Sequence, residues 1–128
     1  MEGKEFEFFL KVFFQKQGDS VEMVPPARSN GADLVIKRSD AATVIRVKRQ
    51  SQPVDHEAVE QVLGARISEK ADQAWVITNN YYTDEAKESA SKSDVKLFDR
   101  DDVMAMIGSS PVARKEFRGK YEIWRSYR

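Results

Sequence analysis

The sequence has no cysteine among its 128 residues. Disulfide bonds and thiolate metal sites are therefore excluded, which is compatible with a reducing compartment. It also lacks any apolar run near the roughly 18 residues that a membrane span needs. Its first residues, Met1–Glu5, lack the basic and apolar regions of a signal peptide. We expect a cytoplasmic protein that does not enter the membrane.

An excess of charge of either sign is also missing, because 21 basic and 21 acidic side chains cancel. The distribution along the chain is uneven. Residues 27–49 carry six basic and two acidic groups, residues 55–102 six and twelve, and residues 111–128 six and two. Domains that bind nucleic acid over a large area are usually basic overall. The pattern therefore predicts either a local basic strip that contacts DNA or solvated charges without a partner.

The remaining pattern is that of an α/β domain. Apolar residues at helical spacing predict helices over 5–17 and 55–67. Thr83-Asp84-Glu85 opens a short predicted helix over 83–91, and a helical turn or two is predicted over 101–107. Runs rich in Val and Ile predict strands over 21–24, 32–37, 43–48, 73–78 and 95–98. Three strands followed by βαβ units predict a mixed sheet of about five strands with helices on both faces. We expect one domain over 1–108 and a basic aromatic extension over 109–128, predicted to be helical.

Two aromatic segments have more than one interpretation. Five of the seven phenylalanines lie in the first predicted helix, which favours core packing, with a homodimer contact as the alternative. The extension interleaves aromatic and basic residues, namely Tyr121, Trp124 and Tyr127 with Arg118, Lys120, Arg125 and Arg128. We expect it to pack on the domain or on a second subunit, and an arm that contacts DNA is the alternative.

Two neighbouring strands carry residues that suit phosphodiester chemistry. Asp33 follows the Asn30-Gly31 turn, and Arg46 and Lys48 point to one face because side chains alternate along a strand. If the strands form a hairpin, Asp33 lies close to Lys48. A carboxylate holds a hard cation that clamps a phosphate, and a lysine offsets charge that develops in the transition state.

Seven blocks of the sequence, in this order, resemble the catalytic domain of Mrr-type restriction endonucleases. They include Gly31-Ala32-Asp33-Leu34-Val35-Ile36 and Val47-Lys48-Arg49, and together they cover residues 3–7, 31–36, 47–49, 51–54, 58–65, 71–79 and 98–101. The resemblance extends over about residues 3–107 and excludes the extension. It implies a restriction-endonuclease-like fold with the D…(E/Q)-x-K signature and DNA cleavage that depends on Mg²⁺ or Mn²⁺.

The resemblance also implies a role for each matched residue. Asp33 is the implied metal ligand, the backbone carbonyl of Val47 a second ligand, and Lys48 the catalytic lysine. Glu7 matches a position that supplies a further acidic group for catalysis or metal binding, and Gln61 matches a helix position near the site. DNA is the implied partner, and a separate recognition or defence-system subunit is expected because the sequence shows no recognition module.

Arg46 departs from the family, which has Glu or Gln two residues before the lysine. Arg46 turned outward would bind a phosphate while Glu7 or Gln61 completed the metal shell, which predicts an endonuclease. Arg46 paired with Asp33 would replace the metal's charge, which predicts an inactive relative that binds DNA or a protein partner. The third alternative is an Arg46 that only faces solvent.

Other residues are weaker candidates. Besides Arg46, the predicted DNA contacts are Arg49, Lys37, Arg38 and the loop residue Tyr81, although loop tyrosines often pack against the domain. His56 and Glu60 have the i, i+4 spacing of a metal-ligand pair. A lone histidine on a polar helix face is more often solvated, so we expect no metal there.

Overall fold

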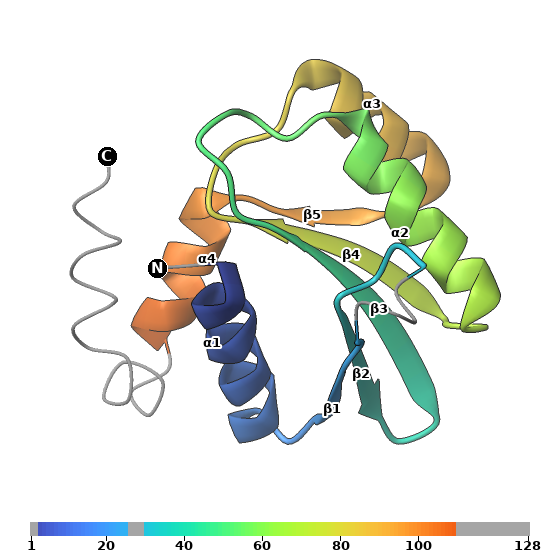
Figure 1. Ribbon diagram of the computed structural model, residues 1–128, viewed down its shortest axis with the longest axis vertical. Helices are drawn as coiled ribbons and strands as arrows, with labels where there is room; N and C mark the ends of the chain where they lie inside the picture. Colours follow the sequence, from blue (N-terminus) through green and yellow to red (C-terminus); the bar gives the residue numbers. More distant parts are fainter. Residues whose placement is uncertain (1–2, 26–29, 110–128) are drawn as a thin grey trace.

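A five-stranded mixed sheet lies at the centre of the computed structural model, which describes residues 3–25 and 30–109 (Figure 1). Its strands are β1 (Ser20–Met23), β2 (Leu34–Arg38), β3 (Ala41–Lys48), β4 (Gln73–Thr78) and β5 (Lys96–Phe98). They lie side by side in sequence order. The first three pair antiparallel, and β3, β4 and β5 run parallel.

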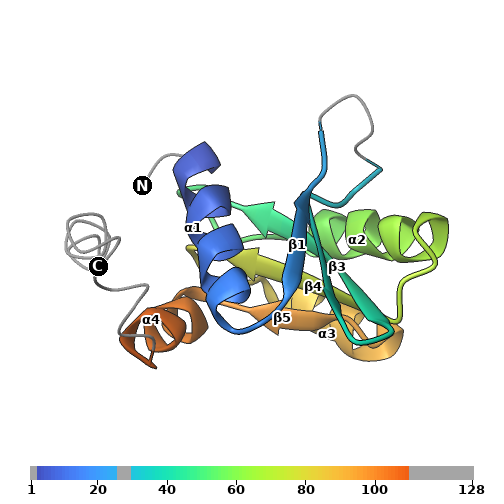
Figure 2. The same ribbon diagram turned by 90° about the horizontal axis from the view of Figure 1, so that it is seen from below.

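Two pairs of helices cover the two faces of the sheet (Figures 1 and 2). On one face lie α1 (Gly3–Lys16) and α4 (Arg100–Ser109), and on the other lie α2 (His56–Ser68) and α3 (Asp84–Ser93). The prediction of a mixed sheet flanked by helices on both faces is confirmed. No helix in the described part of the chain is long and apolar enough to cross a bilayer.

Strand alternation divides the core into two clusters. Ile45 and Val47 of β3 belong to the cluster under α1 and α4, whereas Val44 belongs to the cluster under α2 and α3. Because successive side chains point to opposite faces, Arg46 and Lys48 lie on the α2 and α3 side. The aromatic first helix is a core element: of its five phenylalanines only Phe8 is exposed.

Local signals set the ends of the helices. Gly18, with φ +99°, follows α1 in a backbone conformation that residues other than glycine rarely adopt. Asp55 caps α2 and Thr83 caps α3, each accepting a hydrogen bond from an amide of the first turn. These residues end or begin helices close to the predicted boundaries. Beyond residue 109, the predicted extension lies outside the described residues.

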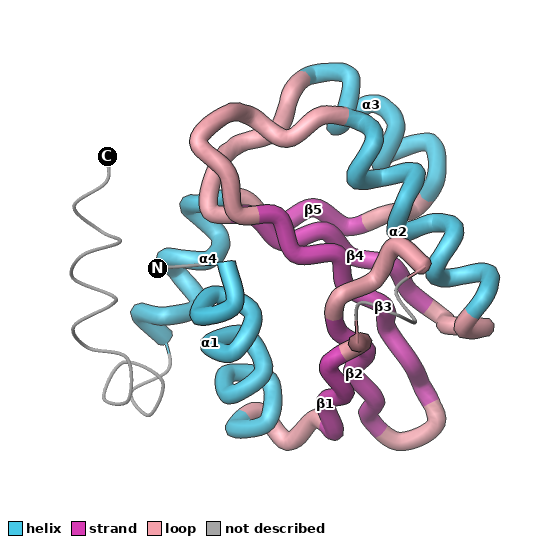
Figure 3. The backbone as a smooth tube through the Cα atoms, viewed as in Figure 1, coloured by secondary structure: helices cyan, strands magenta, loops and turns pink. Residues whose placement is uncertain are grey.

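Two loops meet at the carboxyl ends of β3 and β4. Figure 3 shows the loop that follows β3 beside the loop that follows β4. A bridge between Val54 and Tyr82 joins them, and the Val54 amide donates to the carbonyl of Tyr81 at 2.9 Å. Asp33 lies at this same edge, because β2 is antiparallel to β3 and starts opposite its carboxyl half.

Candidate functional site

The segment before β2 is held against α2 by a glycine. Gly31 has φ +107°, and a Cβ built there would overlap the backbone carbonyl of Gln61. Only glycine allows both the positive φ and this close approach. Two residues later, the Asp33 amide donates to the carbonyl of Ile45 at 2.8 Å. This bond sets Asp33 opposite Arg46, one residue beyond the first β2–β3 pair, Leu34 with Ile45.

Asp33 and Arg46 form an ion pair. The Nη1 atom of Arg46 lies 3.3 Å from Oδ1 and 3.4 Å from Oδ2 of Asp33. The side chains are 21% exposed for Arg46 and 19% for Asp33. One guanidinium nitrogen therefore faces both carboxylate oxygens in a site where little water weakens the attraction. Of the three alternatives for Arg46, this geometry matches pairing with Asp33.

The backbone of β3 also holds the Asp33 carboxylate. Oδ2 accepts a hydrogen bond of 2.7 Å from the backbone amide of Val47. The backbone carbonyl of the same residue is the implied metal ligand. The Nε atom of Arg46 is buried and has no hydrogen-bond partner among the described residues. A charged group with one unsatisfied donor is costly to bury, so its attraction to Asp33 has to offset that cost.

Lys48 lies two residues beyond Arg46 on the same face of β3, and its side chain is half-buried. Its carbonyl accepts a 2.7 Å hydrogen bond from the buried hydroxyl of Thr78 on β4. This bond fixes the end of β3 to the end of β4. The backbone of Lys48 is therefore held in place at the edge of the sheet where Asp33 also lies.

Gln61 and Glu7 lie in different layers of the fold. Gln61 is exposed on α2, and its backbone touches Gly31, so its helix borders the Asp33 segment on the Arg46 face. Glu7 is half-buried on α1, which covers the opposite face. It takes part in an interaction within the domain. The sheet thus separates the helices that carry the two implied stand-ins.

The predicted DNA contacts do not all gather at one edge. Arg49 directly follows β3 and is exposed, and Tyr81 follows β4 and donates its hydroxyl to Asp101 at 3.0 Å. Lys37 and Arg38 lie at the other end of β2, beside the turn into β3. Arg38 donates to Asp19 at 2.9 Å and to the Gln17 carbonyl at 2.6 Å, which ties the end of α1 to the sheet.

The atoms around Asp33 do not fit a magnesium or manganese ion. Magnesium requires near-octahedral oxygen ligands at about 2.0–2.1 Å, but Arg46 and the Val47 amide engage both Asp33 oxygens. Among the described residues, the one set of three Asp, Glu or His ligands close enough to share an ion excludes Asp33. A guanidinium charge beside the carboxylate further opposes a divalent cation.

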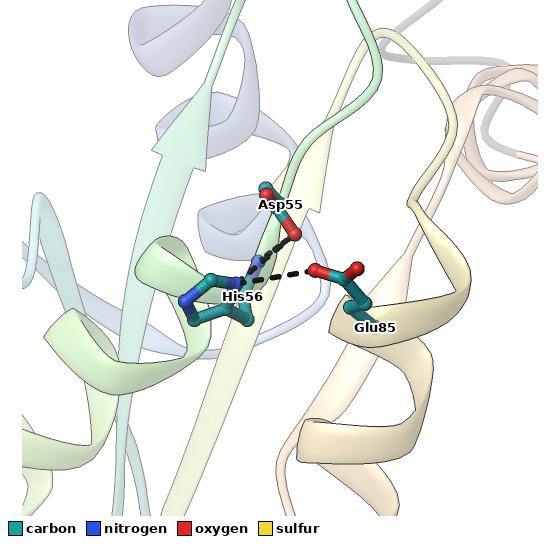
Figure 4. Close-up of side chains that lie close together, drawn as sticks. All are labelled: Asp55, His56 and Glu85. Atoms are coloured by element: carbon teal, nitrogen blue, oxygen red, sulfur yellow. Dashed lines mark hydrogen bonds and ion pairs between the residues drawn. The ribbon is translucent and has the colours of Figure 1, made fainter.

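That set consists of Asp55, His56 and Glu85, where α2 and α3 begin (Figure 4). Oδ1 of Asp55 accepts from the His56 amide at 2.8 Å and from the Thr83 hydroxyl at 2.9 Å, and it lies 3.1 Å from Nδ1 of His56. The His56 amide and the Thr83 hydroxyl lower the pKa of Asp55. The hydrogen bond to Asp55 raises the pKa of His56. These contacts cap α2 and link it to α3.

His56 and Glu60, which have the spacing of a ligand pair but are not expected to bind a metal, lie far apart, with Nε2 of His56 4.0 Å from Oε1 of Glu60. The closer neighbour across the helices is Glu85, 3.8 Å from Nδ1. The side chains of all three residues are more than 40% exposed. Water therefore solvates the group, and helix capping accounts for the position of His56.

Two groups near the carboxyl edge have pKa values that burial raises. Tyr82 is buried and its hydroxyl lies 2.9 Å from the carbonyls of Val76 and Phe98, and burial raises its pKa. Asp99 exchanges hydrogen bonds with Asp102 in the first turn of α4, and burial raises the pKa of Asp99. The spacing of the two aspartates is the capping-box spacing, which the sequence does display.

The architecture resembles that of modification-dependent restriction endonucleases. AspBHI, a DNA modification-dependent restriction endonuclease, aligns with a TM-score of 0.62 and 16% identity over 95% of this chain and 36% of its own. MspJI, solved in complex with a 27-mer oligonucleotide, aligns with a TM-score of 0.59 and 16% identity over 80% of this chain and 27% of its own. At such identities the likeness shows the fold alone.

A protein of unknown function, AF1548, has a TM-score of 0.59 and 19% identity over 70% of this chain and 54% of its own. This chain thus spans about half the length of AF1548 and about a third or less of the two restriction enzymes. No curated protein shows significant similarity to it. The fold is restriction-endonuclease-like. The family model of the Mrr catalytic domain, a restriction endonuclease domain, matches residues 1–107, so the chain belongs to this family.

Proposed function

We propose that this chain is a DNA-binding domain of the restriction endonuclease family in which Arg46 supplies the charge that a divalent cation supplies in active members. The observation that carries the proposal is the position of Nη1 of Arg46, 3.3 and 3.4 Å from the two oxygens of Asp33. The aspartate keeps a positive partner without a metal. Cleavage is correspondingly impaired.

The size of the effect follows from electrostatics. Two unit charges 4 Å apart interact by about 4 kcal/mol at an effective dielectric of 20, and a divalent ion doubles that to about 8 kcal/mol. A quarter of this repulsion, about 2 kcal/mol, weakens metal binding about 30-fold. Arg46 beside Asp33 is therefore incompatible with tight magnesium binding at this carboxylate.

DNA binding is supported by the basic groups at the carboxyl end of β3. Arg46, Lys48 and Arg49 follow one another at the sheet edge, with Asp33 as the acidic partner of Arg46. Membership of a restriction endonuclease family supports DNA as the substrate class. Guanidinium and ammonium groups recognise phosphate oxygens through charge-assisted hydrogen bonds.

A second function, phosphodiester hydrolysis with a divalent metal, is favoured by Lys48, which occupies the position of the family's catalytic lysine at the Asp33 edge. It requires Arg46 to leave Asp33 and bind a phosphate, with Gln61 or Glu7 completing the ligand set. Gln61 is the better placed of the two, because its helix touches the Asp33 segment.

The two functions are separated by nicking of supercoiled plasmid and by calorimetry with MgCl₂. We expect the chain to bind DNA in the presence of EDTA, to bind magnesium weakly and to leave the plasmid intact. Arg46→Glu restores an acid and should bind Mg²⁺ and nick. Adding Lys48→Ala to Arg46→Glu should abolish nicking but keep Mg²⁺ binding. Arg46→Met, which removes the charge without supplying an oxygen ligand, is the control that should neither bind Mg²⁺ tightly nor nick.

Each of the other results has a definite meaning. Magnesium-dependent nicking by the unaltered chain that Lys48→Ala abolishes would establish the second function and refute the first. Nicking that survives Lys48→Ala would come from a contaminant or another site. DNA affinity should fall steeply with salt, because phosphate contacts release counterions. A flat salt dependence would indicate a protein-interaction module instead.

A further inference from the structure

A polar hollow of about 350 Å³ opens where the loops after β3 and β4 meet the start of α4. It begins at the residue that follows Lys48, and none of the Asp33, Arg46 and Lys48 side chains lines it. Its lining residues are Arg49, Gln50, Ser51, Asn79, Asn80 and Arg100. Its volume is near the lower end of ligand sites, which span roughly 300–1,000 Å³.

The lining is cationic. Two of the six residues are arginines, three carry side-chain amides, and none is acidic. Arg100 is buried, with 6% exposure, and its Nη1 donates to the Asn79 carbonyl at 3.3 Å. Arg49 is exposed on the opposite loop. A charge that is held by the backbone and largely shielded from water acts more strongly on an anion than a surface charge does.

The walls of the hollow are already fixed in place. The Gln50 amide donates to Oδ1 of Asn79 at 3.0 Å, and Nδ2 of Asn80 donates to the Gln50 carbonyl at 3.1 Å. The Arg100 amide donates to the Asn80 carbonyl at 2.8 Å. These bonds join three segments of the chain that are distant in sequence. A ligand entering the hollow therefore loses little binding energy to ordering the loops.

The carboxylates next to Arg100 in the sequence have hydrogen-bond partners of their own. Asp99 and Asp102 accept from each other's amides, and Asp101 accepts from the hydroxyl of Tyr81 at 3.0 Å. None of the three lines the hollow. The wall that a ligand meets thus carries the two guanidinium groups, and the three carboxylates lie outside it.

The hollow also lies where the connections after two neighbouring strands turn to opposite faces of the sheet. After β4 the chain continues into α3 on one face of the sheet, and after β5 it continues into α4 on the other face (Figure 1). In open α/β sheets, ligands bind in the crevice at the carboxyl ends of strands where successive connections diverge in this way. Asn79 and Asn80 follow β4, and Arg100 begins α4.

We propose that this hollow binds a backbone phosphate of DNA, distinct from the phosphate nearest Asp33, with Arg49 and Arg100 as its cationic ligands. The inference rests on the DNA binding proposed above and adds a second anchor one loop away. Planar guanidinium groups match phosphate oxygens in geometry as well as charge, and amide groups from the asparagines complete a phosphate contact that reads no sequence.

The test is fluorescence anisotropy of a labelled DNA duplex with 5′-hydroxyl ends, over a series of NaCl concentrations. Ser51→Asp places a carboxylate in the hollow at an exposed residue whose side chain makes no hydrogen bond with the described residues. Arg49→Gln removes one cation and leaves the buried Arg100 in place. The matched controls are Ser91→Asp, exposed near the end of α3, and Lys70→Gln, exposed before β4 at the opposite edge.

Ser51→Asp and Arg49→Gln should each weaken binding about tenfold, equally for duplexes of different sequence. Each should also reduce the slope of log affinity against log salt by about one. The controls should keep the affinity and the slope of the unaltered chain. A variant that had merely lost its fold would show a lower melting temperature, which a thermal scan of each protein detects.

Three results would overturn the inference, and they differ in what they leave standing. If the unaltered chain binds DNA and the two hollow variants behave as the controls do, the hollow is no phosphate site although DNA binding stands. If the unaltered chain binds no duplex, both proposals fail. If 5′-phosphorylated duplex binds more tightly and Ser51→Asp removes that gain, the hollow takes a terminal phosphate monoester instead.

Discussion

The Asp33–Arg46 pair should show a measurable coupling energy in the stability of the domain. At 3.3 Å two unit charges attract by about 5 kcal/mol at an effective dielectric of 20. Most of this gross attraction is offset by the cost of taking both groups out of water. With both side chains about 20% exposed, we expect a net coupling of about 1–2 kcal/mol.

The perturbation is a double-mutant cycle of Asp33→Asn, Arg46→Gln and the two together. Asp33→Asn alone should lower the free energy of unfolding by about 2 kcal/mol. The reason is that the Arg46 guanidinium would then face a neutral amide and the hydrogen bond from the Val47 amide would weaken. The double variant should be less destabilised than the sum of the single variants by the coupling energy. Urea unfolding of the four proteins at one pH and salt concentration measures each free energy.

Lys92 and Glu88 on α3 provide the matched control. Their atoms are closer, at 2.9 Å, but the side chains are 74% and 68% exposed. Solvent screening limits such helix pairs to about 0.3–0.5 kcal/mol. The Asp33–Arg46 coupling should therefore exceed the control several-fold despite the longer distance. A coupling indistinguishable from zero at Asp33 would refute the placement of Arg46 against the carboxylate, and with it the proposed replacement of the metal.

Two further predictions concern neighbouring parts of the domain. Gly31→Ala should destabilise the fold by more than about 2 kcal/mol, since the Cβ meets the Gln61 carbonyl at a positive φ. Gly64→Ala, which meets open space inside α2, should stabilise it by about 0.5–1 kcal/mol in urea unfolding, and equal effects of the two changes would contradict the contact. NMR titration should place the pKa of His56 above about 6.5, the ordinary value, and Asp55→Asn should lower it. Because the folded pKa is the raised one, this contact adds stability at pH below about 6.5 and loses it as the pH rises through the folded value. A His56 pKa that is unchanged in Asp55→Asn would show that the hydrogen bond is not its cause.

Local signals were sufficient to predict the elements of the fold. Runs of Val and Ile, the cap residues Asp55 and Thr83, and helical spacing in the first segment each act over a few residues, and the elements begin and end close to the predicted positions. The strand that follows the Asn30-Gly31 turn begins later than expected, at Leu34. The reason is that residues 30–33 form the tight approach to α2 at Gln61.

The side-chain partners depend on register and on tertiary packing, which local patterns do not determine. Whether Arg46 faces Asp33 depends on the pairing of Leu34 with Ile45. A shift of this pairing by one residue would place a residue other than Asp33 opposite Arg46. Arg38 stays a predicted DNA contact, but nothing in the sequence showed that it also binds Asp19 and the end of α1. The hollow joins three segments far apart in sequence, so no local pattern indicated it.

Under the proposed function, a charge count over the Asp33 site accounts for DNA binding by a restriction endonuclease fold that has Arg46 in place of an acid. In a family site with two carboxylates, one lysine and one divalent ion, the charges add to plus one. In this chain Asp33, Arg46 and Lys48 also add to plus one. The potential that an approaching phosphate meets is therefore similar, although the ion that would polarise the phosphate is replaced by a guanidinium that cannot activate water as a bound metal does. Under this proposal, binding and cleavage are separated by one residue. The same count means that Arg46→Glu, without a metal, leaves the site at minus one, so its DNA affinity should depend on Mg²⁺ while that of the unaltered chain should not.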